Sequence, residues 1–186
     1  VIIENPGEQT AVLFDYPMYM KKILNKDTSV PPCKSTTRNM KITKTIYIDK
    51  NDFREVDEKK YYGLAPNKFI RLKYSEFIKC TGYEKESDGS IKEVYVKFDT
   101  PEKPKKVKGV MSWVNSDAKD VEIRMFDKLE CKTYNGLIEP SFNMKENVSR
   151  VQFERVGYFY IDKDSFIENR LIFNSIVSLR SKYSKK

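Results

Sequence analysis

The 186-residue sequence contains no histidine, only three cysteines and only seven glycines. Without histidine it lacks the commonest general base and the commonest metal ligand of proteins. The glycines are scattered singly, so no glycine-rich loop could cradle the phosphates of a nucleotide. These absences disfavour an independent enzyme and a metal site, and they favour a binding protein.

Long apolar runs are also absent. No stretch approaches the ~18 residues that a membrane-spanning helix needs, and the first residues do not resemble a signal peptide. Cys33, Cys80 and Cys131 are widely spaced and odd in number, which fits neither a zinc site nor a disulfide framework. We therefore expect reduced thiols, a cytoplasmic location and no membrane partner.

Positive charge and aromatic residues are plentiful. Lys and Arg number 35 against 27 Asp and Glu, for a net charge of +8. This balance permits a polyanionic partner, of which nucleic acid is the commonest. The 12 Tyr and 11 Phe favour strands.

Period-2 alternation recurs along the chain, whereas helical periodicity is scarce. The strongest hairpin signal is Asp88-Gly89, between apolar runs at 76–86 and 91–99. One short helix, capped by Asp52, is expected after residue 50. Little helix and many short strands indicate an all-β protein, either antiparallel barrels or a sandwich.

Apolar residues predict which strand faces enter the core. Three sets are expected to share a face within their own segments: Val107, Met111 and Trp113; Val121, Ile123 and Met125; Leu171, Phe173, Val177 and Leu179. The stretch "SRVQFERVGYFYIDKD", residues 149–164, also reads as a strand. It carries Gln152 and Arg155 among its apolar residues.

Four segments are more specific: "YYGLAPNKFIRLKY", "KPKKVKGVMSWV", "VEIRMFDKL" and "VQFERVGYFYIDKDS". In this order, over nearly the whole chain, they resemble the C-terminal anticodon-binding region of glutaminyl-tRNA synthetases. The archaeal and eukaryotic type of glutamyl-tRNA synthetase shares the architecture and matches these motifs less well.

The resemblance implies two stacked, antiparallel, six-stranded β-barrels of the ribosomal protein L25-like fold. Residues 1–44 and 115–186 would form the proximal barrel, and residues 45–114 the distal barrel. The family's catalytic domain, which uses ATP with Mg, would lie upstream, so this fragment should not aminoacylate tRNA alone. Near residues 130–136 the chain is shorter than the family pattern by about 20 residues. Surface loops are the segments that tolerate such differences in length.

The same resemblance assigns Gln152 and Arg155 to the central anticodon base, a uridine. A uracil edge presents two acceptors and one donor, which Gln and Arg together can match. Residues three apart point to opposite faces of a regular strand. For both to reach one base, the strand must bulge or end near Glu154.

The first and third anticodon bases are assigned to a second group. Arg71 and Lys73 would lie near the first base, and Lys60, Tyr61 and Tyr62 near the third. Gly63 stands where some relatives carry Arg, which weakens the case for third-base reading through that contact. No catalytic residue and no metal ligand is expected.

Alternatives remain for these residues. Arg155 could pair with a surface carboxylate, the tyrosines could serve packing, and Lys68, Arg71 and Lys73 could form a solvated edge. The lysines of the run Lys103, Lys105, Lys106 and Lys108 are expected to face water and at most contact phosphates. The expected partners are the anticodon loop of tRNA-Gln and the upstream catalytic domain. The alternative functions are a glutamyl counterpart, or a non-reading scaffold barrel in a multi-synthetase or ribosomal assembly.

Overall fold

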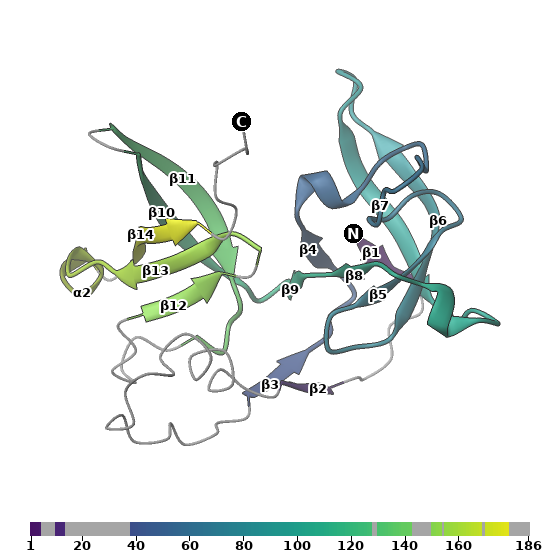
Figure 1. The fold of residues 1–186 in the computed structure, drawn as a ribbon, viewed down its shortest axis with the longest axis horizontal. Helices are drawn as coiled ribbons and strands as arrows, with labels where there is room; N and C mark the ends of the chain where they lie inside the picture. Colours follow the sequence, from purple (N-terminus) through teal and green to yellow (C-terminus); the bar gives the residue numbers. More distant parts are fainter. Residues whose placement is uncertain are drawn as a thin grey trace, which may run out of the picture. The chain divides into compact units, whose positions relative to one another are not determined.

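The computed structural model describes residues 1–4, 10–13, 38–127, 130–142, 150–153, 155–168 and 170–178. The chain divides into two compact units, Val1–Ser116 and Asp117–Lys186, each with its own main sheet and hydrophobic core. Strands make up most of the regular structure in these residues (Figure 1), which confirms the all-β prediction. The two main sheets have five strands each, and their closure into six-stranded barrels stays a prediction.

The main sheet of the first unit has the strand order β1-β7-β6-β5-β8. Its strands are β1 (Ile2–Ile3), β5 (Phe69–Leu72), β6 (Phe77–Lys85), β7 (Ile91–Phe98) and β8 (Val110–Met111). Two further pairs complete the unit: β2 (Thr10–Leu13) with β3 (Arg38–Lys41), and β4 (Ile46–Ile48) with β9 (Trp113–Asn115).

Alternation along β5, β6 and β7 builds the core of this unit. Ile70 and Leu72 on β5 are buried while their neighbours point outward, and the same alternation buries Ile78 and Cys80 on β6 and Val94 and Val96 on β7. The predicted hairpin at Asp88-Gly89 is confirmed, and its loop is closed by the Glu86 N–H, which donates to the Ser90 carbonyl at 2.8 Å. Trp113 is buried in the same core, as predicted, and its Nε1–H donates to the Lys73 carbonyl at 3.0 Å.

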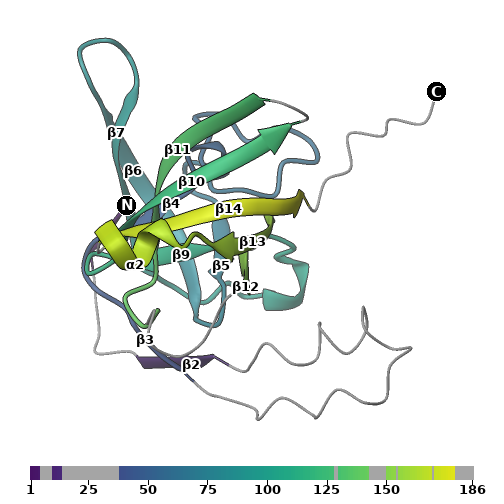
Figure 2. The same ribbon diagram turned by 90° about the vertical axis from the view of Figure 1, so that its left-hand side faces the viewer.

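The second unit is one sheet with the order β11-β10-β14-β13-β12, and its strands lie side by side in Figure 1. The elements are β10 (Lys119–Asp127), β11 (Glu130–Ile138), β12 (Arg150–Phe153), β13 (Gly157–Ile161), α2 (Asp164–Glu168) and β14 (Leu171–Ser178). Figure 2 shows the long β10–β11 hairpin, with β14 beside β10 and α2 at the start of β14. The core contains Val121, Phe159 and Phe173, and Ile123 and Met125 pack against it as predicted.

Three details differ from the expectations. The short helix exists as a 3-10 turn, η1 (Lys50–Asp52), but Asp49 caps it rather than Asp52, because the Asp49 side chain accepts the Asn51 N–H. Val177 does not share the face of Phe173. The β13–β14 register shifts between Tyr158 and Phe159, and such a bulge inverts the alternation beyond it.

The first unit ends at Ser116, and Ile2–Ile3 pairs with β7 inside it. The expected division into a proximal barrel of residues 1–44 with 115–186 and a distal barrel of residues 45–114 stays a prediction. Residues 130–138, near which the chain is shorter than the family pattern, form the continuous strand β11.

The described residues contain no helix long and apolar enough to cross a membrane. Within the same residues, no group of three or more Cys, Asp or Glu side chains is arranged to hold a metal ion. Cys80 is a buried free thiol and Cys131 an exposed one. Cys33 and Leu179 lie outside the described residues.

Candidate nucleic-acid interface

A loop between β4 and β5 carries the predicted residues Lys60, Tyr61 and Tyr62, and backbone hydrogen bonds hold it in place. Its two arms meet where the Arg54 N–H donates to the Leu64 carbonyl at 3.0 Å and the Leu64 N–H donates to the Asp52 carbonyl at 2.7 Å. Phe53 and Leu64 form the parallel bridge between the arms, and both are buried. The loop is therefore anchored to the core.

Glu55 ties this loop to the β6–β7 hairpin. The Lys85 Nζ lies 2.7 Å from the Glu55 carboxylate, and the Tyr83 hydroxyl donates to it at 3.0 Å. The hydrogen bond from Lys85, and after it that from Tyr83, lowers the pKa of Glu55 below its ordinary 4.5. The Phe53 and Tyr83 rings are 5.4 Å apart beneath this cluster. Charge and packing together fix the base of the loop.

The ring of Tyr61 is held by two cations. The Arg54 guanidinium lies 4.5 Å and the Lys68 ammonium 5.0 Å from its centroid, and the Lys68 Nζ donates to the Tyr61 carbonyl at 2.7 Å. Lys68 also pairs with Asp57. Tyr61 thus has a packing role in this loop, and its contact with RNA stays a prediction.

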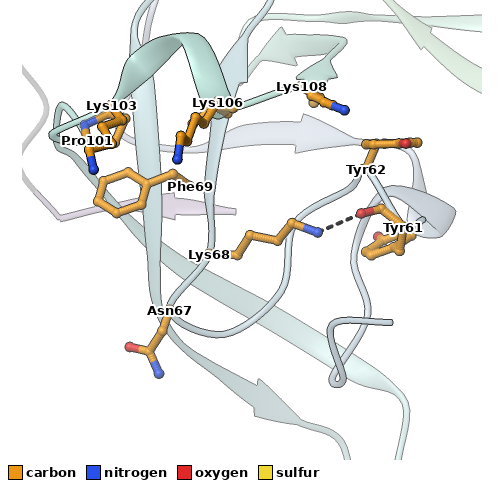
Figure 3. Close-up of a pocket in the computed structure, with 11 residues that line it drawn as sticks. Tyr61, Tyr62, Asn67, Lys68, Phe69, Pro101, Lys103, Lys106 and Lys108 are labelled. Atoms are coloured by element: carbon orange, nitrogen blue, oxygen red, sulfur yellow. Dashed lines mark hydrogen bonds between the residues drawn. The ribbon is translucent and has the colours of Figure 1, made fainter. Parts of the chain in front are cut away.

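An open groove of about 470 Å³ lies beside this loop (Figure 3). Its lining is mainly aromatic and basic: Tyr61, Tyr62, Asn67, Lys68, Phe69, Pro101, Lys103, Lys106, Val107, Lys108 and Gly109. The Tyr62 side chain is 55% exposed, which leaves its ring accessible. Aromatic faces stack with unpaired bases and lysines attract phosphates. The groove therefore has the chemistry of a single-stranded nucleic-acid site.

Lys103, Lys106 and Lys108 were expected to face water and at most to contact phosphates. All three are exposed, but the segment before β8 also brings them against the Tyr62 loop. Gly109 makes the close approach: a Cβ there would come 2.2 Å from the Tyr62 carbonyl oxygen. In the sequence, the one sign of this close approach is that Gly109 directly follows the basic run.

The other predicted residues of this unit lie nearby but outside the groove lining. Lys60 is exposed and has a left-handed backbone, with φ 72°, in the turn where the Tyr61 N–H donates to the Glu58 carbonyl. Arg71 points outward from β5. Lys73 begins the turn into β6, and its ammonium lies 5.0 Å from the Tyr74 ring centroid.

Gln152 and Arg155 lie in the second unit, on a hairpin rather than on one strand. β12 ends at Phe153, the Val156 N–H donates to the Phe153 carbonyl at 3.1 Å, and β13 begins at Gly157. This confirms that regular strand structure is interrupted near Glu154, and it corrects the interpretation of residues 149–164 as one strand. Arg155 is exposed in the turn, with a left-handed φ of 65°.

The environment of Gln152 follows from alternation. Its neighbour Val151 is buried in the core and Phe153 packs against the same core, so Gln152 points to the opposite face. There its cross-strand partner is Tyr158. A left-handed residue other than glycine costs about 1–2 kcal/mol, and Arg155 shares this conformation with Lys60, Asn67 and Tyr74.

Two regions of the chain match known protein families. Residues 4–99 and residues 110–162 match two models of the anticodon-binding domain of class I tRNA synthetases for E and Q, that is, glutamate and glutamine. The chain belongs to this family. The anticodon-binding assignment thus covers both units, and the two matches contain all seven residues predicted from the resemblance.

Three curated relatives illustrate the similarity, and each is named as a glutamine--tRNA ligase. Glutamine--tRNA ligase of Photobacterium profundum is 34% identical over 175 residues, covering 80% of this chain and 32% of the relative. The cytoplasmic enzyme of Arabidopsis thaliana is 36% identical over 170 residues, 77% of this chain and 21% of the relative. A probable glutamine--tRNA ligase of Dictyostelium discoideum is 30% identical over 94% of this chain and 25% of the relative. The chain thus spans at most about a third of these relatives.

Proposed function

We propose that this chain reads the anticodon of tRNA-Gln on behalf of a glutamine–tRNA ligase. The names of its relatives support glutamine as the amino acid. Attachment of glutamine would use ATP with Mg in a catalytic domain outside these 186 residues, in the cytoplasm. The partners would be the tRNA anticodon loop, that catalytic domain and, in some cells, a multi-synthetase assembly. Residues 1–44 with 115–186 would form one L25-like barrel, and residues 45–114 the other.

The central uridine would be read by Gln152 and Arg155. The observation that carries this proposal is the interruption of regular strand structure after Phe153, with Arg155 in a left-handed turn one residue beyond Glu154. This removes the objection that a regular strand would send the two side chains to opposite faces. The amide can donate and accept while the guanidinium donates, which suits the two carbonyls and the N–H of uracil.

The flanking bases would be taken by the first unit. Tyr62 offers an accessible ring for stacking, which is worth about 1–3 kcal/mol per base. Tyr61 would shape the groove, and Lys60, Arg71 and Lys73 would contribute charge around it. Lysines at the groove would add salt-sensitive affinity without reading sequence.

A glutamyl counterpart is the second candidate, because the family models cover both amino acids. Both anticodons have U at the centre and differ at the third base, so Gln152 and Arg155 cannot separate the two functions. Binding of anticodon stem-loops with G or C at the third position decides between them. Tighter binding of C would overturn the glutamine assignment.

The central-base proposal is tested by Gln152→Glu. A carboxylate accepts but does not donate, so it should repel the uracil carbonyls and accept from the amino group of cytosine. Fluorescence anisotropy with stem-loops carrying U or C at the centre should show preference shifting toward C, by about 1–3 kcal/mol. An unchanged U-to-C ratio would contradict the assignment and favour a scaffold that reads no base.

A further inference from the structure

A basic row crosses the outer face of the main sheet in the first unit. Phe69 on β5 is the register partner of Lys79 on β6, and Lys79 is the partner of Lys97 on β7. These three side chains point away from the core because their strand neighbours are buried: Ile70, Ile78 and Val96. We name this surface the Phe69–Lys79–Lys97 row.

The row holds two like charges directly opposite each other, an arrangement that destabilises a sheet. The Lys79 ammonium lies 5.3 Å from the Phe69 ring centroid, and within the described residues Lys79 forms no ion pair. The carboxylate of Asp99 reaches Lys97, at a long 3.7 Å. Other carboxylates on this face have partners of their own: Glu4 after β1 accepts from the Thr81 hydroxyl at 2.8 Å, and Glu93 on β7 accepts from the Tyr95 hydroxyl at 3.0 Å.

The row also continues the groove. Phe69 lines the groove together with Lys103 and Lys106, and Figure 3 shows these two lysines in the same part of it as the Phe69 ring. Lys79 and Lys97 stand on the next two strands, each about 4.8 Å further along the sheet. Positive charge therefore extends from the groove across the sheet face.

We infer that the Phe69–Lys79–Lys97 row binds backbone phosphates of the single-stranded nucleotides that run past the groove. This inference rests on the proposed function, because it takes RNA as the ligand. A phosphate between Lys79 and Lys97 would compensate the repulsion that the register imposes. Lysine binds phosphate as a point charge and reads no base, so the row supplies affinity and leaves specificity to other residues.

The salt dependence of RNA binding tests the row. The variants are Lys79→Gln with Lys97→Gln, and the matched control is Lys92→Gln, an exposed lysine on the same strand as Lys97. With a tRNA-Gln anticodon stem-loop, the slope of log affinity against log salt should become shallower by about 0.7 per lysine removed. At about 0.1 M salt this corresponds to about fivefold weaker binding per lysine. The control should keep the wild-type slope.

Two further arms separate a charge effect from misfolding. Lys97→Arg keeps the charge and should keep the slope, and circular dichroism shows whether each variant retains its strands. If the folded double variant keeps the wild-type slope, the row does not bind phosphates. The proposed function would still hold in that case if the wild-type chain prefers U at the central base. A shallower slope with that preference intact supports the row. Absence of RNA binding by the wild-type chain overturns both.

Discussion

Gly63 lies against the ring of Tyr61, so closely that a Cβ at Gly63 would come 2.2 Å from the Tyr61 hydroxyl oxygen. The same Cβ would come 2.7 Å from the Asp52 carbonyl oxygen. The tyrosine therefore occupies space that any larger residue at 63 would need. An Arg at this position would require a different placement of Tyr61.

Gly63→Ala should destabilise the first unit by about 1–3 kcal/mol, because overpacking forces the Tyr61 ring and the Asp52 backbone to shift. Urea unfolding followed by tryptophan fluorescence measures this, since Trp113 lies in the core of that unit. Gly82→Ala is the matched control: a Cβ at Gly82 meets nothing within 4 Å, so its effect should stay within about 0.5 kcal/mol. Equal destabilisation by both substitutions would refute the steric explanation.

Substitutions at Arg155 should change the stability of the second unit and the recognition of the central base in different ways. Glycine tolerates a left-handed backbone, so Arg155→Gly should stabilise the second unit by about 0.5–1 kcal/mol after its larger loss of backbone entropy. The same change should cost about 1–3 kcal/mol of central-base discrimination. Arg155→Ala should lose the discrimination without the gain in stability. Unfolding curves and stem-loop titrations on the same samples check both halves, and a glycine variant that still prefers central U would show that Arg155 does not read the base.

Local patterns predicted much of this fold. The Asp88-Gly89 hairpin and the core-facing residues of β10 depend on turn chemistry and alternation, which sequence displays directly. The interruption near Glu154 followed from asking how Gln152 and Arg155 could reach one base. Each of these predictions concerns residues that are close together in the sequence.

Relationships between distant segments were not predictable in this way. The parallel pairing of Val121 with Leu171 joins strands 50 residues apart, and alternation alone does not specify a partner strand. The bulge that turns Val177 outward depends on the β13–β14 register. The groove combines the Tyr61–Tyr62 loop, β5 and the run before β8, so the sequence did not show that lysines of this run line one groove with the tyrosines.

Tyr62→Leu tests stacking in the groove. Leucine keeps apolar bulk but offers no aromatic face, so binding of the anticodon stem-loop should weaken by about 1–3 kcal/mol. Tyr47→Leu on β4 is the control, because Tyr47 is comparably exposed but does not line the groove. Tyr62→Phe should bind like the wild-type chain. Equal losses for the Tyr62 and Tyr47 variants would remove the groove from the RNA-binding surface.

Asp162 makes the second unit sensitive to acid. Its carboxylate accepts the Asp164 N–H at 2.9 Å and the Asn174 Nδ2–H at 2.6 Å, and it faces Arg124 Nη1 at 3.1 Å. These contacts, the Asp164 N–H foremost, lower the pKa of Asp162 below its ordinary 3.8. Folded Asp162 therefore binds fewer protons than unfolded Asp162 at low pH.

The stabilisation from Asp162 is complete above pH 3.8 and is lost as the pH falls through the lower, folded pKa. The urea midpoint of the second unit, followed by circular dichroism, should fall as the pH is reduced from about 5 to about 3. Asp162→Asn removes the titrating group, so its midpoint should fall less steeply, whereas Asp120→Asn, at an exposed position on β10, should follow the wild type. If the urea midpoint falls equally in the wild type and both variants, other carboxylates control the response to acid. The Arg124–Asp162 contact would then contribute orientation rather than pH-dependent stability.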